Sequence, residues 1–100
     1  MATTRSSAEL DPRRRKILFR CWHRGTKEMD LVFGRFADSE IDGLDNDDLD
    51  AFELLMEFPD RDLFSWISGE VMPPVDVQTK IYSKIVSFTN SINQQNFNGI

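Results

Sequence analysis

Apolar residues in this chain recur three and four positions apart in every segment long enough to form regular structure. That spacing gathers them on one face of an α-helix. No segment alternates apolar and polar residues for long enough to form a strand, and glycine or proline interrupts the pattern at Gly25, at Gly69 and at the pair Pro73 and Pro74. The sequence therefore predicts an all-α fold, a compact five-helix bundle with short loops.

Start and stop signals place the five helices along the chain. Asp11 is a good N-cap residue and Pro12 has the fixed φ of a first helical residue, so the first helix is expected from Pro12 to about His23. Gly25 then ends this helix from a left-handed conformation. The acidic stretch 39–48 is expected to be a loop, and the other helices are expected from near Thr26 to near Asp38, from Leu49 to Phe58, from Pro59 to Gly69, and from about Val75 to Asn93.

The length of 100 residues fits one domain. A chain of this size can form a single core without disulfides or metals, but it cannot also enclose a large cofactor pocket. We expect residues 1–10 to form a disordered N-terminal tail, residues 11–93 to form a single helical domain, and the amide-rich residues 94–100 to form a frayed C-terminal tail.

Charge is divided between two parts of the chain. The net charge of -5 combines +6 over residues 1–27 with -11 over residues 28–62, and the remainder is neutral. The basic residues Arg13 to Lys16 suggest a phosphate-binding face on the first helix. The acidic middle opposes this interpretation, and no helix carries a coherent row of base-reading side chains. A small helical regulator of antitoxin or nucleic-acid-associated type, using this basic helix, is therefore the alternative function.

The sequence offers little for catalysis, nucleotide binding or metal binding. Cys21 and His23 do not face each other on a helix, and Cys21 lies on the apolar stripe. No glycine-rich phosphate loop is present, and one cysteine and one histidine do not complete a zinc site. The acidic loop resembles an EF-hand loop, but Leu49 stands where the bidentate glutamate is required. We expect no catalytic, cofactor-binding or metal-binding residues.

Compartment signals favour a protein of a reducing environment. The single cysteine has no intramolecular disulfide partner. No apolar run approaches the length of a membrane span, and residues 1–10 lack the apolar stretch of a secretory signal. We therefore expect no membrane insertion and a bacterial cytoplasmic location, with the mitochondrial matrix as the alternative.

The turn from His23 to Glu28 is the most informative segment. A left-handed Gly25 lets the chain reverse sharply, and Arg24 is expected on the outer side of the corner. Glu28 lies one turn into the next helix, within the expected reach of Arg24. On physical grounds alone, this is an ordinary capped corner with a surface ion pair worth less than about 1 kcal/mol.

This corner, written R-G-x-x-E as Arg24, Gly25 and Glu28, resembles the signature of the succinate dehydrogenase FAD assembly factors. A second stretch, from Asp60 to Ile67, is similar to the D-x-D-L-F-x-W-hydrophobic segment of that family. A linker with glycine and proline and a last helix follow it, as in the family. The likeness spans about residues 13–89, which is most of the chain.

The resemblance implies a non-enzymatic assembly factor. Such a protein binds the flavoprotein subunit of succinate dehydrogenase, with fumarate reductase as a further candidate client, and promotes covalent attachment of FAD to that subunit. It would hold no cofactor stably, because FAD attaches to the client. It would contact no nucleic acid and would be monomeric when free.

By the same resemblance, Arg24, Gly25 and Glu28 form the centre of the client interface, with His23 and Lys27 as neighbours. Arg24 would offer a planar fork to client carboxylates or carbonyls, and Glu28 would orient Arg24 or accept a hydrogen bond from the client. Three residues of the second motif are expected in the internal cap and core and are left out of the interface: Asp62, Phe64 and Trp66.

Overall fold

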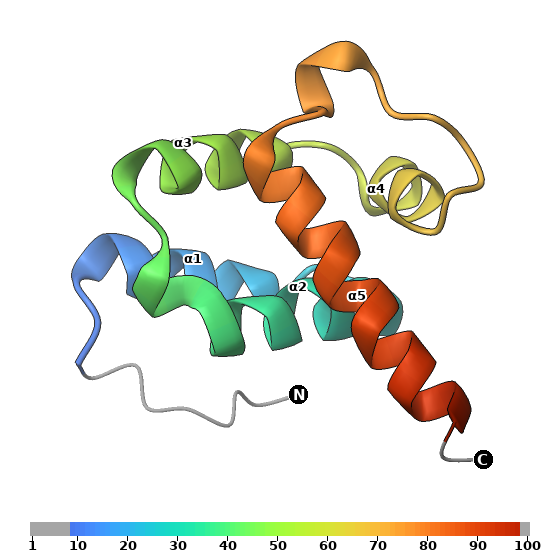
Figure 1. Cartoon of the computed structure of the whole chain (residues 1–100). Helices are drawn as coiled ribbons and strands as arrows, with labels where there is room; N and C mark the ends of the chain where they lie inside the picture. The colour runs from blue at the N-terminus through green and yellow to red at the C-terminus, as the bar shows by residue number, and fades with distance from the viewer. Residues whose placement is uncertain (1–8, 99–100) are drawn as a thin grey trace.

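The computed structural model describes residues 9–98, with side chains up to residue 91. Its elements are, in chain order, α1 (Pro12–Cys21), α2 (Lys27–Glu40), the 3-10 turn η1 (Ile41–Gly43), α3 (Asn46–Leu55), α4 (Asp60–Ile67), the 3-10 turn η2 (Val75–Val77) and α5 (Lys80–Asn98). All regular structure over these residues is helical, which confirms the predicted all-α, five-helix fold (Figure 1). None of the described helices is both long and apolar enough to cross a membrane.

Side-chain caps set the beginnings of the helices. The Asp11 carboxylate accepts a hydrogen bond from the Arg14 backbone N–H at the start of α1, as predicted. The Asp45 carboxylate accepts from the Asp48 backbone N–H at 2.8 Å, so α3 begins at Asn46, within the stretch that was predicted to be a loop. The acidic residues before Leu49 are thus part of a helix start, where the helix dipole favours negative charge.

The predicted fifth helix has different bounds in the structure. Val75–Val77 forms the separate turn η2, and Gln78, with ψ 63°, interrupts the helical path before α5 begins at Lys80. At the other end α5 continues to Asn98, so the predicted end at Asn93 is wrong. Residues 1–8 and 99–100, which hold most of the predicted N-terminal tail and the end of the C-terminal tail, lie outside the described residues.

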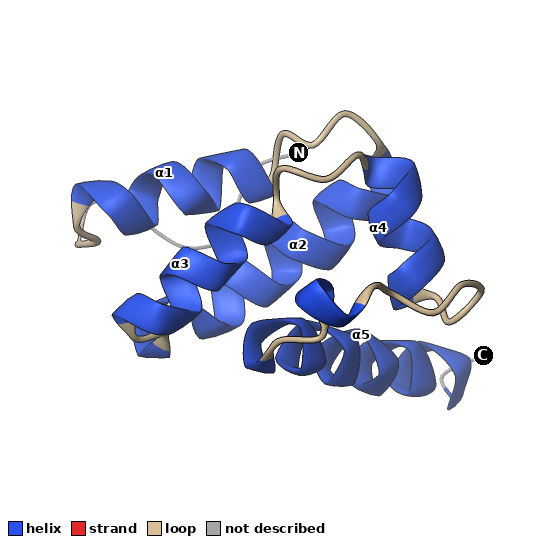
Figure 2. Ribbon diagram, turned by 90° about the horizontal axis from the view of Figure 1, so that it is seen from above, coloured by secondary structure: helices blue, strands red, loops and turns tan. Residues whose placement is uncertain are grey.

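Helix α2 packs against both α1 and α5, and α3 packs against α5 (Figure 2). Phenylalanine rings join these helices: Phe52 of α3 meets Phe33 and Phe36 of α2 edge to face, with ring centroids 5.5 and 5.7 Å apart. Phe36 makes a similar contact with Phe88 of α5. Leu10, which precedes α1, also belongs to this core.

The contact between α2 and the Trp22 ring, at the end of α1, depends on a glycine. A Cβ atom added at Gly34 would lie 2.4 Å from the Trp22 ring, which is buried between the helices. The indole Nε1–H of Trp22 donates to the Asp38 carboxylate at 3.2 Å, so the ring is held at its polar end as well. A side chain at position 34 would therefore require either the Trp22 ring or the backbone of α2 to move, and either movement would disturb the packing of the core.

The basic and acidic parts of the chain meet in the fold. Arg13 of α1 pairs with Asp50 and with Glu53 of α3, and Arg20 pairs with Glu57 at 2.7 Å. The guanidinium of the neighbouring basic residue, Arg14, donates to the backbone carbonyls of Ile41 and Leu44. Much of the charge that suggested a phosphate-binding helix is therefore engaged within the protein.

Replacing Gly34 with alanine is expected to destabilise the protein by about 1 to 3 kcal/mol, because the added methyl group overpacks the contact with Trp22. Gly43→Ala is the matched control, since nothing lies within 4 Å of a Cβ atom there. Urea unfolding followed by circular dichroism measures both changes. Equal stability of the two variants would show that the helix contact tolerates a side chain.

The Asp45 cap predicts a defined acid sensitivity. The hydrogen bond from the Asp48 backbone N–H lowers the pKa of the Asp45 carboxyl from its ordinary value of 3.8. A folded-state pKa below the unfolded one gives stability that is present above about pH 4 and is lost as pH falls through the folded value. Asp45→Asn, which keeps a capping oxygen without the charge, is expected to lose less stability between pH 5 and pH 3 than the parent protein in urea unfolding. An equally steep loss in both proteins would contradict this role.

Candidate partner-binding site

The corner between α1 and α2 reverses the chain in a few residues. Gly25 has φ 113°, a left-handed conformation that L side chains rarely adopt, and this confirms the predicted glycine stop. A Cβ atom there would lie 3.9 Å from the Asp60 carboxylate, an ordinary contact distance, so the backbone conformation rather than lack of room requires glycine. Thr26 then caps α2 by accepting from the Met29 backbone N–H at 3.3 Å.

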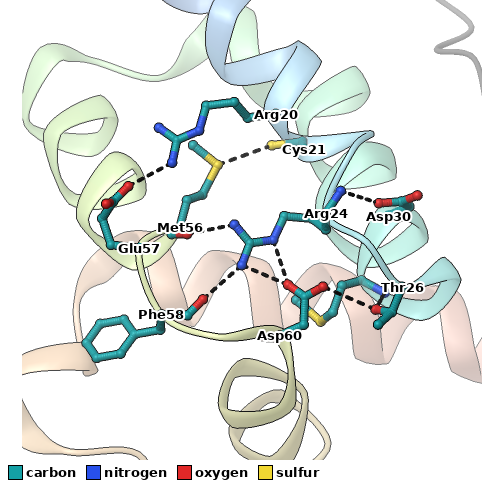
Figure 3. Close-up of polar contacts among 10 residues, drawn as sticks. Arg20, Cys21, Arg24, Thr26, Asp30, Met56, Glu57, Phe58 and Asp60 are labelled. Atoms are coloured by element: carbon teal, nitrogen blue, oxygen red, sulfur yellow. Dashed lines mark hydrogen bonds and ion pairs between the residues drawn. The ribbon is translucent and has the colours of Figure 1, made fainter.

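Arg24 points into the protein and not outward. Its Nε–H donates to Asp60 Oδ1 at 2.8 Å, Nη1 donates to the Met56 carbonyl at 2.6 Å, and Nη2 donates to the Phe58 carbonyl at 2.9 Å (Figure 3). The side chain is only 11% exposed. The expectation that Arg24 lies on the outer side of the corner is therefore wrong: its planar fork fits acceptors at the end of α3 and the start of α4.

The acidic partner of Arg24 is Asp60 and not Glu28. Asp60 is the first residue of α4 and is 14% exposed, and its other carboxylate oxygen accepts from the Thr26 hydroxyl at 3.4 Å. The Arg24 backbone N–H donates to Asp30 Oδ1 at 2.6 Å. This network joins the two sequence motifs, because Arg24 belongs to R-G-x-x-E and Asp60 opens the D-x-D-L-F segment.

The remaining candidate residues of the corner lie on its surface. Gly25, Lys27 and Glu28 are exposed around the start of α2. His23 is exposed as well, and its ring stacks on that of Phe19, with centroids 4.0 Å apart. The structure thus brings four of the five candidate residues to one exposed corner, with Arg24 behind them.

Sequence reasoning missed aromatic residues beside this corner. Phe58 is partly exposed, its carbonyl accepts from Arg24, and its ring meets Trp66 edge to face at 5.2 Å. Phe64 is 42% exposed, so its predicted place in the core is wrong, whereas Trp66 packs against the core as predicted. Asp62 lies in the first turn of α4, which has no side-chain cap, so its predicted role as an internal cap is wrong as well. One signal in the sequence could have linked the two motifs: one contains an arginine, Arg24, and the other begins with an aspartate, Asp60.

The thiol of Cys21 is not placed for nucleophilic chemistry. Cys21 is fully buried beside Met56, with the two sulfur atoms 3.9 Å apart. Burial raises the pKa of the Cys21 thiol well above its usual range, so the thiol stays protonated. Among residues 9–91, no three side chains of the metal-ligating types are gathered closely enough to hold an ion.

Replacing one partner of the Arg24–Asp60 pair is expected to destabilise the protein strongly. Asp60→Asn should cost about 3 kcal/mol, because it leaves a nearly buried guanidinium without its counter-charge. Arg24→Lys should also lower stability, since one ammonium group cannot reach three acceptors set around a planar fork. The exposed Glu28→Gln is the control and should change stability by less than about 0.5 kcal/mol. Urea unfolding distinguishes these results, and an Arg24→Lys protein as stable as the parent would contradict the structural role of Arg24.

Comparison with known proteins gives consistent matches. Residues 15–89 match a family described as the flavinator of succinate dehydrogenase. The FAD assembly factor SdhE of Acetobacter pasteurianus is 34% identical over 77 residues, which cover 77% of this chain and 71% of the relative. The FAD assembly factor SdhE of Legionella pneumophila (strain Lens) is 36% identical over 73 residues, or 73% of this chain and 85% of the relative. The mitochondrial succinate dehydrogenase assembly factor 2 of Dictyostelium discoideum is 34% identical over 74 residues, or 74% of this chain and 52% of the relative. No solved structure matches the chain.

The matched range contains both motifs and therefore the whole network around Arg24. It also contains α1 to α4 almost complete and the first half of α5, so the match covers the fold as well as the corner. The resemblance seen in R-G-x-x-E and in the segment from Asp60 to Ile67 is thereby confirmed. This chain belongs to the family of succinate dehydrogenase flavinators.

Proposed function

We propose that this protein binds the flavoprotein subunit of succinate dehydrogenase and promotes covalent attachment of FAD to it. The family membership and the names of the bacterial relatives, FAD assembly factors, support this function. The observation that carries it is the exposed corner around Gly25 and Glu28, which the buried Arg24 holds in one conformation. A rigid exposed corner loses little conformational freedom when a client binds to it.

The residues of the corner have different roles in this proposal. Glu28 and Lys27 offer opposite charges to the client, and Gly25, two residues before Lys27, leaves the backbone of the corner accessible. His23 extends the surface together with the ring of Phe19. Arg24 acts from behind, by fixing the positions of the exposed residues. The division of charge along the chain also has a local meaning here, since the sign changes between Lys27 and Glu28, within the corner itself.

The protein acts as an assembly factor and not as the enzyme. Binding to the corner selects a client conformation in which the flavin lies against the client's own acceptor histidine, so the gain in rate comes from positioning. FAD becomes attached to the client and is not held stably by the factor, which is monomeric when free. Fumarate reductase is a second candidate client. The proposed location is the bacterial cytoplasm, with the mitochondrial matrix as the alternative.

Co-purification with the flavoprotein subunit tests this function. Cells that express the subunit with and without this protein are compared by in-gel flavin fluorescence, which detects covalently bound FAD. We expect the factor to co-purify with the subunit that lacks covalent FAD, and we expect fluorescence to fall when the gene is absent. Unchanged fluorescence without the gene, together with no co-purification, would refute the function.

Gly25→Arg is expected to abolish client binding while most helical structure remains. The arginine places a bulky side chain on the exposed corner and requires a strained left-handed backbone. Gly43→Arg is the control, because Gly43 has open space around it and lies in η1, outside the corner. Pull-down of the flavoprotein subunit and far-ultraviolet circular dichroism are measured on both variants. Retained pull-down by a folded Gly25→Arg protein would contradict the proposed interface.

The alternative function, a regulator that binds nucleic acid through the basic helix, makes a different prediction. Phosphate binding weakens steeply with salt, whereas binding to the flavoprotein subunit requires one specific protein. The ion pairs of Arg13 with Glu53 of α3 and of Arg20 with Glu57, just after α3, argue against a phosphate-binding face. A titration with duplex DNA at low salt is expected to show no binding, and salt-sensitive binding there would favour the alternative.

A further inference from the structure

A groove of about 380 Å³ lies between α2, α4 and α5. In Figure 1, α4 and α5 lie on the right of the view, on the side where α2 begins. Leu31 and Val32 of α2, Phe64 and Ile67 of α4, and Phe88 of α5 supply its apolar lining. Phe64 is the most exposed of these five, and a large aromatic side chain left in contact with water at a groove is typical of a docking site.

Two opposite charges flank this apolar lining. Glu28 and Arg35 both line the groove and lie two helical turns apart on α2, a rise of about 10 Å. Both side chains are exposed. A segment that enters the groove therefore meets a negative charge at one end and a positive charge at the other, which fixes its direction.

The groove is continuous with the corner in two ways. Glu28 belongs to the R-G-x-x-E corner and also lines the groove. In addition, Arg24 holds Asp60, the first residue of α4, and α4 carries Phe64 and Ile67. The network behind the corner thus also sets the position of one wall of the groove.

Thr89 adds a polar feature to the opposite wall. It lies on α5 and lines the groove, and its Oγ1 atom is buried with no hydrogen-bond partner among the described residues. Buried polar atoms in native proteins nearly always have a partner. A chain lying along this wall brings backbone donors and acceptors close to it.

We propose that this groove is a second docking site for the flavoprotein subunit, which inserts an apolar side chain between α2 and α4. The inserted segment carries a basic residue on the side of Glu28 and an acidic residue on the side of Arg35. This inference rests on the proposed function and extends it from the corner to a neighbouring surface. At about 380 Å³ the groove has room for one or two large side chains, and the opposite charges at its two ends suit a short client segment that carries one charge of each sign.

Photo-crosslinking identifies the occupant directly. Benzoylphenylalanine at position 64 keeps an aromatic side chain in the groove, and the same residue at position 54 is the control, because Leu54 is exposed on α3 and does not line the groove. The variants are irradiated with the purified flavoprotein subunit that lacks covalent FAD. We expect crosslinks from position 64 to an apolar segment of the subunit that carries both charges, and few from position 54. Crosslinks from position 64 to a second copy of this chain, or equal crosslinks from both positions, would overturn the proposal.

Affinity measurements provide the second readout. Phe64→Ala is expected to weaken binding of the same subunit roughly tenfold, as truncation of an interface anchor does. Arg35→Glu should also weaken binding, whereas Leu54→Ala and Arg15→Glu, changes at exposed residues that do not line the groove, should not. Calorimetric titration measures each dissociation constant after circular dichroism has shown that the variant is folded.

The two proposals fail in different ways. If the unmodified protein does not bind the subunit, the proposed function fails. If the unmodified protein binds the subunit, and the Phe64→Ala and Arg35→Glu variants both bind it as tightly as the unmodified protein does, the groove proposal is overturned while the proposed function stands.

Discussion

The structure depends on one nearly buried guanidinium. Arg24 satisfies the carbonyls of Met56 and Phe58, which follow α3, and pairs with Asp60, which begins α4. Two parts of the chain more than thirty positions apart, the corner between α1 and α2 and the connection between α3 and α4, are thereby held together. The guanidinium fork has a fixed geometry. Loss of this side chain would leave the Asp60 carboxylate without its counter-charge and two carbonyl groups without a hydrogen-bond partner. The conformation of the exposed corner and the placement of α4 both follow from this contact.

This arrangement separates two roles within a single short motif. Arg24 is directed inward, while Gly25 and Glu28 remain on the surface. In the proposed function, a change at Arg24 therefore reaches the client indirectly, through the shape of the corner and the position of Phe64 on α4. Part of the charge asymmetry of the chain is likewise paired within the fold, since Arg13 and Arg20 of α1 form ion pairs with Glu53 of α3 and with Glu57 just after it. What remains for a client is a local pattern of charges and apolar groups around the start of α2.

Local signals in the sequence predicted much of the fold. Asp11 with Pro12, and Gly25 with its left-handed conformation, act through neighbouring backbone groups, so their effects can be read along the chain. The start of α3 at Asn46 was missed because acidic residues fit both a loop and a helix start. The direction of Arg24 was missed for a different reason. Its acceptors lie more than thirty positions away in the sequence, whereas Glu28, only four positions away, was the nearer acidic partner. The exposure of Phe64 also depends on how α4 packs, which periodicity alone does not determine.

The central claim is that Arg24 serves the client interface through Asp60 and not by touching the client. A double-mutant cycle in client affinity tests it most directly, with Arg24→Lys, Asp60→Asn and the double variant titrated against the flavoprotein subunit that lacks covalent FAD. If the two residues act as one unit, the double variant should bind about as weakly as the weaker single variant. If the two losses of binding free energy simply add, Arg24 contributes to the client independently of Asp60, and the account is wrong.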